Sequence, residues 1–197
     1  MGKIFYIMGK SASGKDKIYG SILKNEKLGL KDLVLYTTRP IRRGEVDGKQ
    51  YYFVDEKKLN ELRKENRIIE ERSYDTVHGI WTYFTADDGM TDLEHFNYIG
   101  IGTLESFAKL QRYYGADKIV PVYIEVEDGI RLERALIRER KQAEPKYKEM
   151  CRRFLADSED FSEENIAAAN IARRFQNNTE LEVCMKEVED YLESVIY

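Results

Sequence analysis

The sequence predicts a single α/β domain built around parallel strands, and three observations carry this prediction. The apolar run Ile4–Met8 is too short for a helix and is rich in β-branched and aromatic residues, as a buried parallel strand is. Two further apolar runs, at 96–101 and 118–126, are each followed by a helical pattern. The length of 197 residues allows one substantial core but not two full domains.

Composition narrows the classes of function. The charged fraction is 35% and the net charge is −4, which argues against a general nucleic-acid binder and means that any basic site is local. Cys151 and Cys184 lack metal-ligand spacing and are too few for a disulfide framework. The sequence contains no signal-peptide pattern or long apolar span. We therefore expect a cytoplasmic protein without a membrane or nucleic-acid partner.

The first motif directly follows the strand at Ile4–Met8. Residues 9–15, GKSASGK, fit the spacing G-x-x-x-x-G-K, in which backbone N–H groups surround a phosphate and the lysine reaches the β- and γ-phosphates. Ile18, Ile22 and Leu23 then recur at helical spacing, which places the loop at a helix N-terminus that favours an anion. The predicted nucleotide-binding residues are Gly9, Lys10, Ser11, Ala12, Ser13, Gly14, Lys15 and Asp16.

Asp16 stands where this motif usually has a Ser or Thr whose hydroxyl holds Mg²⁺. A carboxylate is also a hard oxygen ligand, so we predict Asp16 as a metal ligand and Mg²⁺ as a cofactor. The alternative is that its negative charge repels the nucleotide.

The second motif, TTRPIRRGEVDGKQYYFV at residues 37–54, predicts a turn that carries arginines. Arg39, Arg42 and Arg43 precede an Asp47-Gly48 turn and an aromatic strand at 51–54. Arginines on a turn can bind phosphate oxygens bidentately. On composition alone, a solvated basic loop is the favoured alternative.

Together the two motifs resemble those of the guanylate kinases, whose hallmark is T-T-R, a second Arg, G-E, a further Gly and then Y-x-F. The resemblance implies a three-layer α/β/α P-loop kinase with a parallel sheet. It also implies an inserted monophosphate-binding lobe at 37–90, a lid at 134–152 and a core formed by 1–36, 91–133 and 153–197. The implied reaction is transfer of the γ-phosphoryl group of ATP to GMP or dGMP, which gives GDP or dGDP and ADP.

The same resemblance assigns roles to residues outside the loop. Arg39, Arg42, Tyr51 and Tyr83 would hold the acceptor phosphate, Glu70 would accept from guanine N1–H and N2–H₂, and Thr85 would be the small hydroxyl residue of the site. Lys15, Arg138 and Arg153 would act on the transferring phosphoryl group. The alternative for Glu70 is a solvated strand-edge charge, and the alternative for the lid is an exposed helix with salt bridges to Glu133 and Glu139.

Three positions depart from the family pattern. Gly100 and Gly102 stand where the family has D-x-D, and Leu35 stands near the place of a serine that donates to guanine O6. The base of the acceptor therefore stays open, because discrimination depends on such buried partners. One alternative is a kinase for another (deoxy)nucleoside monophosphate or phosphorylated small molecule, and a second is a non-catalytic guanylate-kinase-like binding module. We also hypothesise that the carboxylate missing from the strand end has moved to Asp16.

The remaining patterns predict further elements. They indicate strands at 33–36, 67–71 and 171–175, a helix capped by Asp55 with Leu59 and Leu62 inside, and a helix capped by Thr103. Thr179 and Glu182 predict a capping box for a last helix whose apolar stripe faces the core. His78, next to a glycine, is predicted to be a turn residue.

Overall fold

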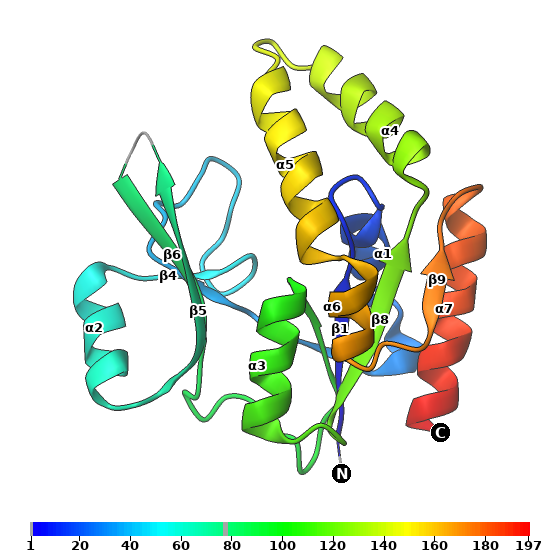
Figure 1. The fold of residues 1–197 in the computed structure, drawn as a ribbon. Helices are drawn as coiled ribbons and strands as arrows, with labels where there is room; N and C mark the ends of the chain where they lie inside the picture. Colours follow the sequence, from blue (N-terminus) through cyan, green and yellow to red (C-terminus); the bar gives the residue numbers. More distant parts are fainter. Residues whose placement is uncertain (1, 77–78) are drawn as a thin grey trace.

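A computed structural model describes residues 2–76 and 79–197 (Figure 1). His78 lies outside the described residues. The elements in chain order are β1 (Ile4–Met8), α1 (Lys15–Ile22), the 3₁₀ helix η1 (Glu26–Leu28), β2 (Lys31–Asp32), β3 (Tyr36–Thr37), β4 (Tyr52–Phe53), α2 (Glu56–Lys64), β5 (Ile68–Thr76), β6 (Gly79–Ala86), β7 (Tyr98–Ile101), α3 (Leu104–Tyr114), β8 (Ile119–Glu125), α4 (Asp128–Arg140), α5 (Tyr147–Asp160), α6 (Glu163–Ala168), β9 (Arg174–Gln176) and α7 (Leu181–Ile196).

The main sheet is parallel in the described part of the chain, with strand order β2-β7-β1-β8-β9. Alternate residues of β1 point to opposite faces of the sheet. Ile4, Tyr6 and Met8 pack with α3 and α6, whereas Phe5 and Ile7 pack with α1 and α7. Helices therefore cover both faces, which confirms the predicted three-layer α/β/α architecture with a parallel sheet.

A second sheet, with strand order β4-β3-β6-β5, lies to one side of the main sheet (Figure 1). The helix α2 covers it through Leu59 and Leu62, which form a small core with Phe84. The side chain of Asp55 accepts a hydrogen bond from the Lys58 amide at 2.8 Å and caps α2 as predicted. This sheet and α2 occupy residues 36–86 of the chain.

The helices α4 and α5 form a hairpin that projects beyond the carboxyl end of β1 and β8 (Figure 1). The residues between them, 141–146, contain the charged break and Pro145. No helix in the described ranges is long and apolar enough to cross a membrane.

Two predicted elements are wrong. The strand expected at 33–36 is instead two short strands, β2 and β3, which belong to different sheets. The chain crosses between the sheets here, because the Leu33 amide donates to Ile99 of the main sheet while the Leu35 carbonyl accepts from Tyr52 of the second sheet. The capping box at Thr179 and Glu182 is also wrong, since α7 begins at Leu181 after Glu180, whose side chain makes no capping bond.

The apolar stripe of the last helix is confirmed as core. Val188 and Leu192 are fully buried against the α1 face of the sheet. The capping of α3 by Thr103 is also confirmed, because its hydroxyl accepts from the Ser106 amide at 3.2 Å.

Candidate functional site

Residues 9–16 connect β1 to α1 and form a loop held from behind by Asn177. The Asn177 amide donates to the Ser13 carbonyl at 2.8 Å, and an added Cβ at Gly14 would lie 2.6 Å from the same nitrogen. Gly14 is left-handed with φ 87°, so glycine suits both its conformation and this close approach. Because α1 begins at Lys15, its first amides have no partner within the helix and its positive dipole end faces the loop.

A buried ion-pair network fixes the loop to the α4–α5 hairpin. Arg131 of α4 is 1% exposed, and its guanidinium contacts Asp128 at 2.9 Å, Asp157 of α5 at 3.4 Å and the Ser11 carbonyl at 3.4 Å. Asp157 also accepts from the Ser11 amide at 2.6 Å. The guanidinium stacks on Phe154, 4.0 Å from the ring centroid. The position of the hairpin is therefore tied to the backbone of the loop 9–16.

A cavity of about 320 Å³ opens where the loop, the hairpin and the second-sheet region meet. Ser11 of the loop, Arg42 of the arginine turn, and Arg138 and Arg153 of the hairpin all line it. Arg138 and Arg153 are exposed, whereas Arg131 on the same side is buried. The structure thus brings together predicted residues that lie up to 142 positions apart in the chain.

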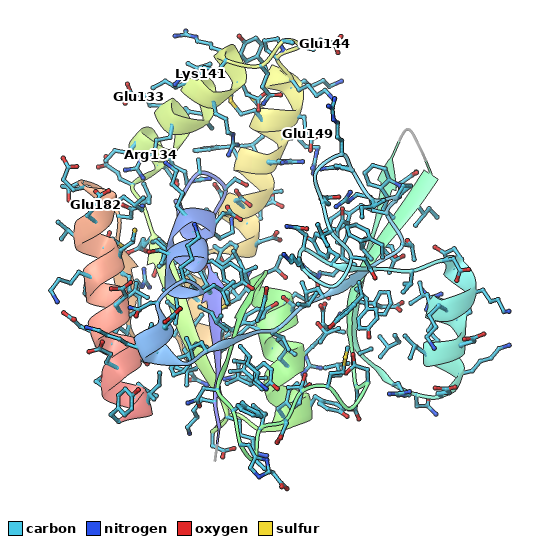
Figure 2. All side chains as sticks on the ribbon, turned by 180° about the vertical axis from the view of Figure 1, so that it is seen from behind. Glu133, Arg134, Lys141, Glu144, Glu149 and Glu182 are labelled. Carbon is cyan, nitrogen blue, oxygen red and sulfur yellow. The ribbon has the colours of Figure 1, made fainter. Side chains whose placement is uncertain are left out.

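Glu149 holds two arginines at this cavity. It accepts from Arg152 at 2.8 Å and from Arg153 at 2.9 Å, and these contacts lower the pKa of Glu149 to about 2. Figure 2 shows Glu149 on the side of α5 that faces the second-sheet region, whereas Glu133 and Arg134 lie on the outer side of α4. The interleaved acid Glu139 is buried and accepts from the Lys146 amide at 3.0 Å.

Arg39, Tyr51 and Tyr83 form one cluster in the second-sheet region. Arg39 is 3% exposed and makes a bidentate pair with Glu45 at 3.0 and 2.8 Å. Its guanidinium lies 5.6 Å from the Tyr51 ring, and the Tyr51 and Tyr83 rings meet edge to face at 5.5 Å. Burial raises the pKa of Tyr51, so its phenol stays protonated and can donate at neutral pH. The cluster offers hydrogen-bond donors side by side.

Glu70 and Thr85 meet across the β5–β6 pair, and Arg72 joins them. The Thr85 hydroxyl donates to Glu70 Oε1 at 3.1 Å, and Arg72 donates to both Glu70 oxygens at 3.1 and 3.4 Å. The Glu70 side chain is fully buried, while 13% of the Arg72 side chain is exposed. Burial disfavours the charged form of Arg72, but the charge and hydrogen bond of Glu70, together with Tyr6 and Tyr74, outweigh burial and raise the pKa of Arg72 above its ordinary value.

The side chain of Tyr6 fills the space beside Gly100 and Gly102. An added Cβ at Gly102 would lie 2.0 Å from the Tyr6 hydroxyl, and one at Gly100 would lie 2.9 Å from the Tyr6 ring. The Tyr6 hydroxyl is paired with Ser106 Oγ at 2.8 Å. Burial, and after it the charge of Glu70, raises the pKa of Tyr6, which stays neutral. Aspartates at these two positions are incompatible with this tyrosine.

Asp16 is the predicted metal ligand. Its side chain is 85% exposed and lies 3.9 Å from the Lys15 ammonium at the start of α1. Within the described residues, no group of three or more His, Cys, Asp or Glu side chains could form a metal cage. A single exposed carboxylate beside a phosphate loop fits Mg²⁺, which keeps several waters and takes its other ligands from phosphates.

Several site residues escaped the sequence analysis. Arg72 lies two positions after Glu70 on a strand and therefore on the same face, which is a signal that alternation supplies. Tyr6 pairs in register with Gly100, and a glycine in a strand often marks a close approach. Asp157 and Asn177 act on the loop from 146 and 164 residues away, and no local pattern indicates either contact.

Comparisons with known proteins place the sequence similarity in the first half of the chain. A family model described as "Guanylate kinase" matches residues 1–82. The guanylate kinase of Mycoplasma mobile is 42% identical over 69 residues, which are 35% of this chain and 34% of that protein. The guanylate kinase of Neisseria gonorrhoeae is 34% identical over 97 residues, which are 49% of this chain and 45% of that protein. The matched part thus spans less than half the length of these relatives.

The similarity of fold extends further than the similarity of sequence. The crystal structure of guanylate kinase from Anaplasma phagocytophilum matches 98% of this chain and 85% of its own, with a TM-score of 0.64 and 20% sequence identity. The first half of the chain is therefore similar in sequence to guanylate kinases, and nearly the whole chain shares the fold of a guanylate kinase structure.

Proposed function

We propose that this protein is a nucleoside monophosphate kinase that transfers the γ-phosphoryl group of ATP to GMP or dGMP and releases ADP with GDP or dGDP. The observation that carries the proposal is the cavity lined jointly by Ser11, Arg42, Arg138 and Arg153. The loop, the arginine turn and the hairpin each place hydrogen-bond donors or positive charge at this cavity. Phosphoryl transfer between two nucleotides requires such a concentration of donors and positive charge.

The donor nucleotide is assigned to the phosphate loop. The loop amides and Lys15 bind the β- and γ-phosphates. Asp16 would hold Mg²⁺, which would supply charge neutralisation to the phosphates. Arg138, on the segment 134–152 that we propose as a lid, and Arg153, directly after this segment, stabilise charge on the equatorial oxygens of the moving group. Arg131 and Asp157 are positioning residues, because they hold the α4–α5 hairpin against the loop 9–16.

The acceptor is assigned to the proposed lobe at 37–90. Arg39, Arg42, Tyr51 and Tyr83 hold its phosphate in line with the γ-phosphoryl group. Glu70 and Thr85 lie deeper on the same face of the second sheet. A phosphate monoester is mostly dianionic near neutral pH, so its oxygen can attack without a strong general base. We also propose a cytoplasmic location for this reaction, in line with the expectation from the sequence.

The test is chromatographic separation of nucleotides after incubation with ATP, Mg²⁺ and one monophosphate at a time. The panel contains GMP, dGMP, AMP, CMP, UMP and dTMP. We expect equimolar GDP and ADP from GMP, and loss of both products in Lys15→Met but not in the control Lys17→Met, which alters an exposed lysine on the same helix.

Two outcomes contradict the proposal in different ways. A clear preference for a pyrimidine or adenine nucleotide would support the kinase activity but exclude guanine nucleotides as the preferred acceptor. Calorimetry that detects no ATP binding in the presence of Mg²⁺ would instead favour the non-catalytic binding module.

A further inference from the structure

Glu70, the residue expected to read the acceptor's base, is a buried and fully paired carboxylate in this protein. Both oxygens of Glu70 already accept hydrogen bonds, from Thr85 at 3.1 Å and from Arg72 at 3.1 and 3.4 Å, and none of its side-chain surface is exposed. A base could reach this carboxylate only after Arg72 moved away and left a buried charge unpaired, which is costly.

Of the Glu70–Arg72 pair, only Arg72 is partly exposed, with 13% of its side-chain surface accessible. It lines a cavity of about 660 Å³ together with Ser73, Tyr74 and Thr103. Its Nε and Nη2 face Glu70, and its Nη1 makes a long contact of 3.5 Å with the Thr103 hydroxyl. Arginine has five N–H donors, so the edge formed by Nη1 and Nη2 keeps two that have no partner within the described residues.

Three carboxylates, Glu71, Glu105 and Asp160, line the same cavity as Arg72, but they lie on β5, α3 and α5 and not at the end of β7. Glu71 is paired with Arg63, and Glu105 is paired with Lys109. Tyr6 occupies the space beside Gly100 and Gly102, and its hydroxyl is already paired with Ser106. The end of β7 therefore carries a neutral phenol and hydroxyl groups instead of acidic side chains. At this strand end, the charged group without a complete set of partners among the described residues is the Arg72 guanidinium.

Resting on the proposed function, we infer that Arg72 recognises the base of the acceptor through the O6 and N7 acceptors of a 6-oxopurine, and that Glu70 is the positioning residue that orients Arg72. A guanidinium edge matches O6 and N7 of guanine with two parallel hydrogen bonds. The 2-amino group makes no contact in this arrangement. The substrate class is therefore 6-oxopurine monophosphates in general, with or without the 2-amino group.

The test compares kcat/KM of the unmodified protein for three acceptors: GMP, IMP, which lacks the 2-amino group, and 7-deaza-GMP, which lacks N7. We expect kcat/KM for IMP to lie within about threefold of the value for GMP. The value for 7-deaza-GMP should be lower than that for GMP by about 10-fold or more, since a hydrogen bond to a charged group contributes about that factor. The reverse pattern, in which kcat/KM is much lower for IMP than for GMP and equal for 7-deaza-GMP and GMP, would overturn the inference but leave the proposed kinase activity intact. No turnover with any monophosphate would overturn the proposed function itself.

Two variants separate the roles of the paired residues. Arg72→Met should lower kcat/KM for GMP by about 10- to 100-fold and abolish the difference between GMP and 7-deaza-GMP, with partial rescue in Arg72→Lys. Glu70→Gln should lower kcat/KM for GMP and for IMP by the same factor, because Glu70 acts on both substrates through Arg72. A selective loss of GMP over IMP in Glu70→Gln would show that Glu70 itself contacts the 2-amino group, which contradicts the inference.

The matched control is Arg63→Met. Arg63 makes a bidentate pair with Glu71 at 3.0 and 3.2 Å, and Glu71 neighbours Glu70 on β5 but points to the other face of the sheet. The Arg63→Met change should leave the relative kcat/KM values for GMP, IMP and 7-deaza-GMP unchanged. If Arg72→Met does not fold, the substrate ratios of the unmodified protein still decide the question.

Discussion

The two sides of the proposed site, the phosphate-binding side and the base-binding side, are built in opposite ways. The phosphate loop is contiguous, residues 9–16, and uses mainly backbone geometry at the end of β1. The base-binding side consists of side chains from three distant segments: Tyr6 on β1, Glu70 and Arg72 on β5, and Ser106 on α3. A loop that works through its backbone requires a fixed spacing of residues, whereas packed side chains can be replaced together by another set that fills the same space. The first side therefore keeps the sequence pattern of the guanylate kinases, and the second side departs from it.

The largest expected effect lies on the phosphate side. Lys15→Met should reduce phosphoryl transfer by about 10³-fold, because it removes a positive charge aimed at the β- and γ-phosphates in the transition state. The rate of ADP formation at saturating GMP and ATP measures it. Lys17→Met, with its exposed side chain, is the control and should stay within twofold. A loss below 10-fold would remove Lys15 from the mechanism.

This side of the site was predictable because its signal is local. A strand, a G-x-x-x-x-G-K spacing and a helix follow one another within about 20 residues, and each supports the others. The boundaries of β1 and the start of α1 at Lys15 follow the prediction. What the local signal could not supply is Asn177, which holds the loop from the other end of the chain.

The second effect concerns the network that joins the loop to the hairpin. Arg131→Met should lower the free energy of unfolding by about 3 kcal/mol, because it leaves Asp157 partly buried without its cation. Denaturation by urea measures it. Arg140→Met, which alters an exposed arginine at the end of α4, is the control and should change stability by less than about 0.5 kcal/mol.

A companion variant separates stability from positioning. Asp157→Asn keeps the size of the side chain but weakens its bond to the Ser11 amide. We expect a weaker affinity for ATP in calorimetry with a smaller loss of stability than in Arg131→Met. Unchanged ATP affinity in Asp157→Asn would show that the hairpin does not hold the phosphate loop in place.

The spacing of Arg131, Arg134 and Arg138 could not reveal this network. Residues three and four apart share a helical face, yet Arg131 is 1% exposed and Arg138 is exposed. The difference arises because the first turn of α4 lies against the phosphate loop while its last turns project away from the core (Figure 1). Burial here is set by tertiary contacts that spacing alone does not specify.

The third effect lies on the base side and is smaller. Gly102→Ala should destabilise the protein by about 1–3 kcal/mol, because its Cβ would lie 2.0 Å from the hydroxyl of the buried Tyr6. Combining it with Tyr6→Leu should cost less than the sum of the two single changes, since the leucine leaves the space free. Additive effects in this double-mutant cycle would show that Tyr6 does not occupy the place of the missing carboxylates.

The control for this cycle is Gly20→Ala. Gly20 lies within α1 and an added Cβ there meets no atom within 4 Å. Alanine favours a helix more than glycine does, so this change should stabilise the protein by about 0.5–1 kcal/mol. The same substitution should thus have opposite signs at the two glycines.

The smallest effect returns to the phosphate side and concerns Glu149, which lies 41% exposed between Arg152 and Arg153. Glu149→Gln should change the free energy of unfolding by less than about 0.5 kcal/mol at neutral pH, because exposed ion pairs contribute little. Its pKa is lowered from 4.5 to about 2, first by Arg152 and then by Arg153. The small stabilisation is therefore complete above pH 4.5 and is lost as the pH falls towards 2.

A carboxyl NMR titration of Glu149 makes this residue a sensor for the hairpin arginines. Arg153→Met should raise the Glu149 pKa only part of the way to 4.5, since Arg152 still donates to it. If Arg153 moves onto a phosphate when a nucleotide binds, Glu149 loses a partner and gains a negative neighbour, and both changes raise its pKa. ATP should therefore raise the Glu149 pKa in the unmodified protein. A pKa that is indifferent to ATP would mean that these arginines do not reach the nucleotide, and the phosphate side would then depend on the loop alone.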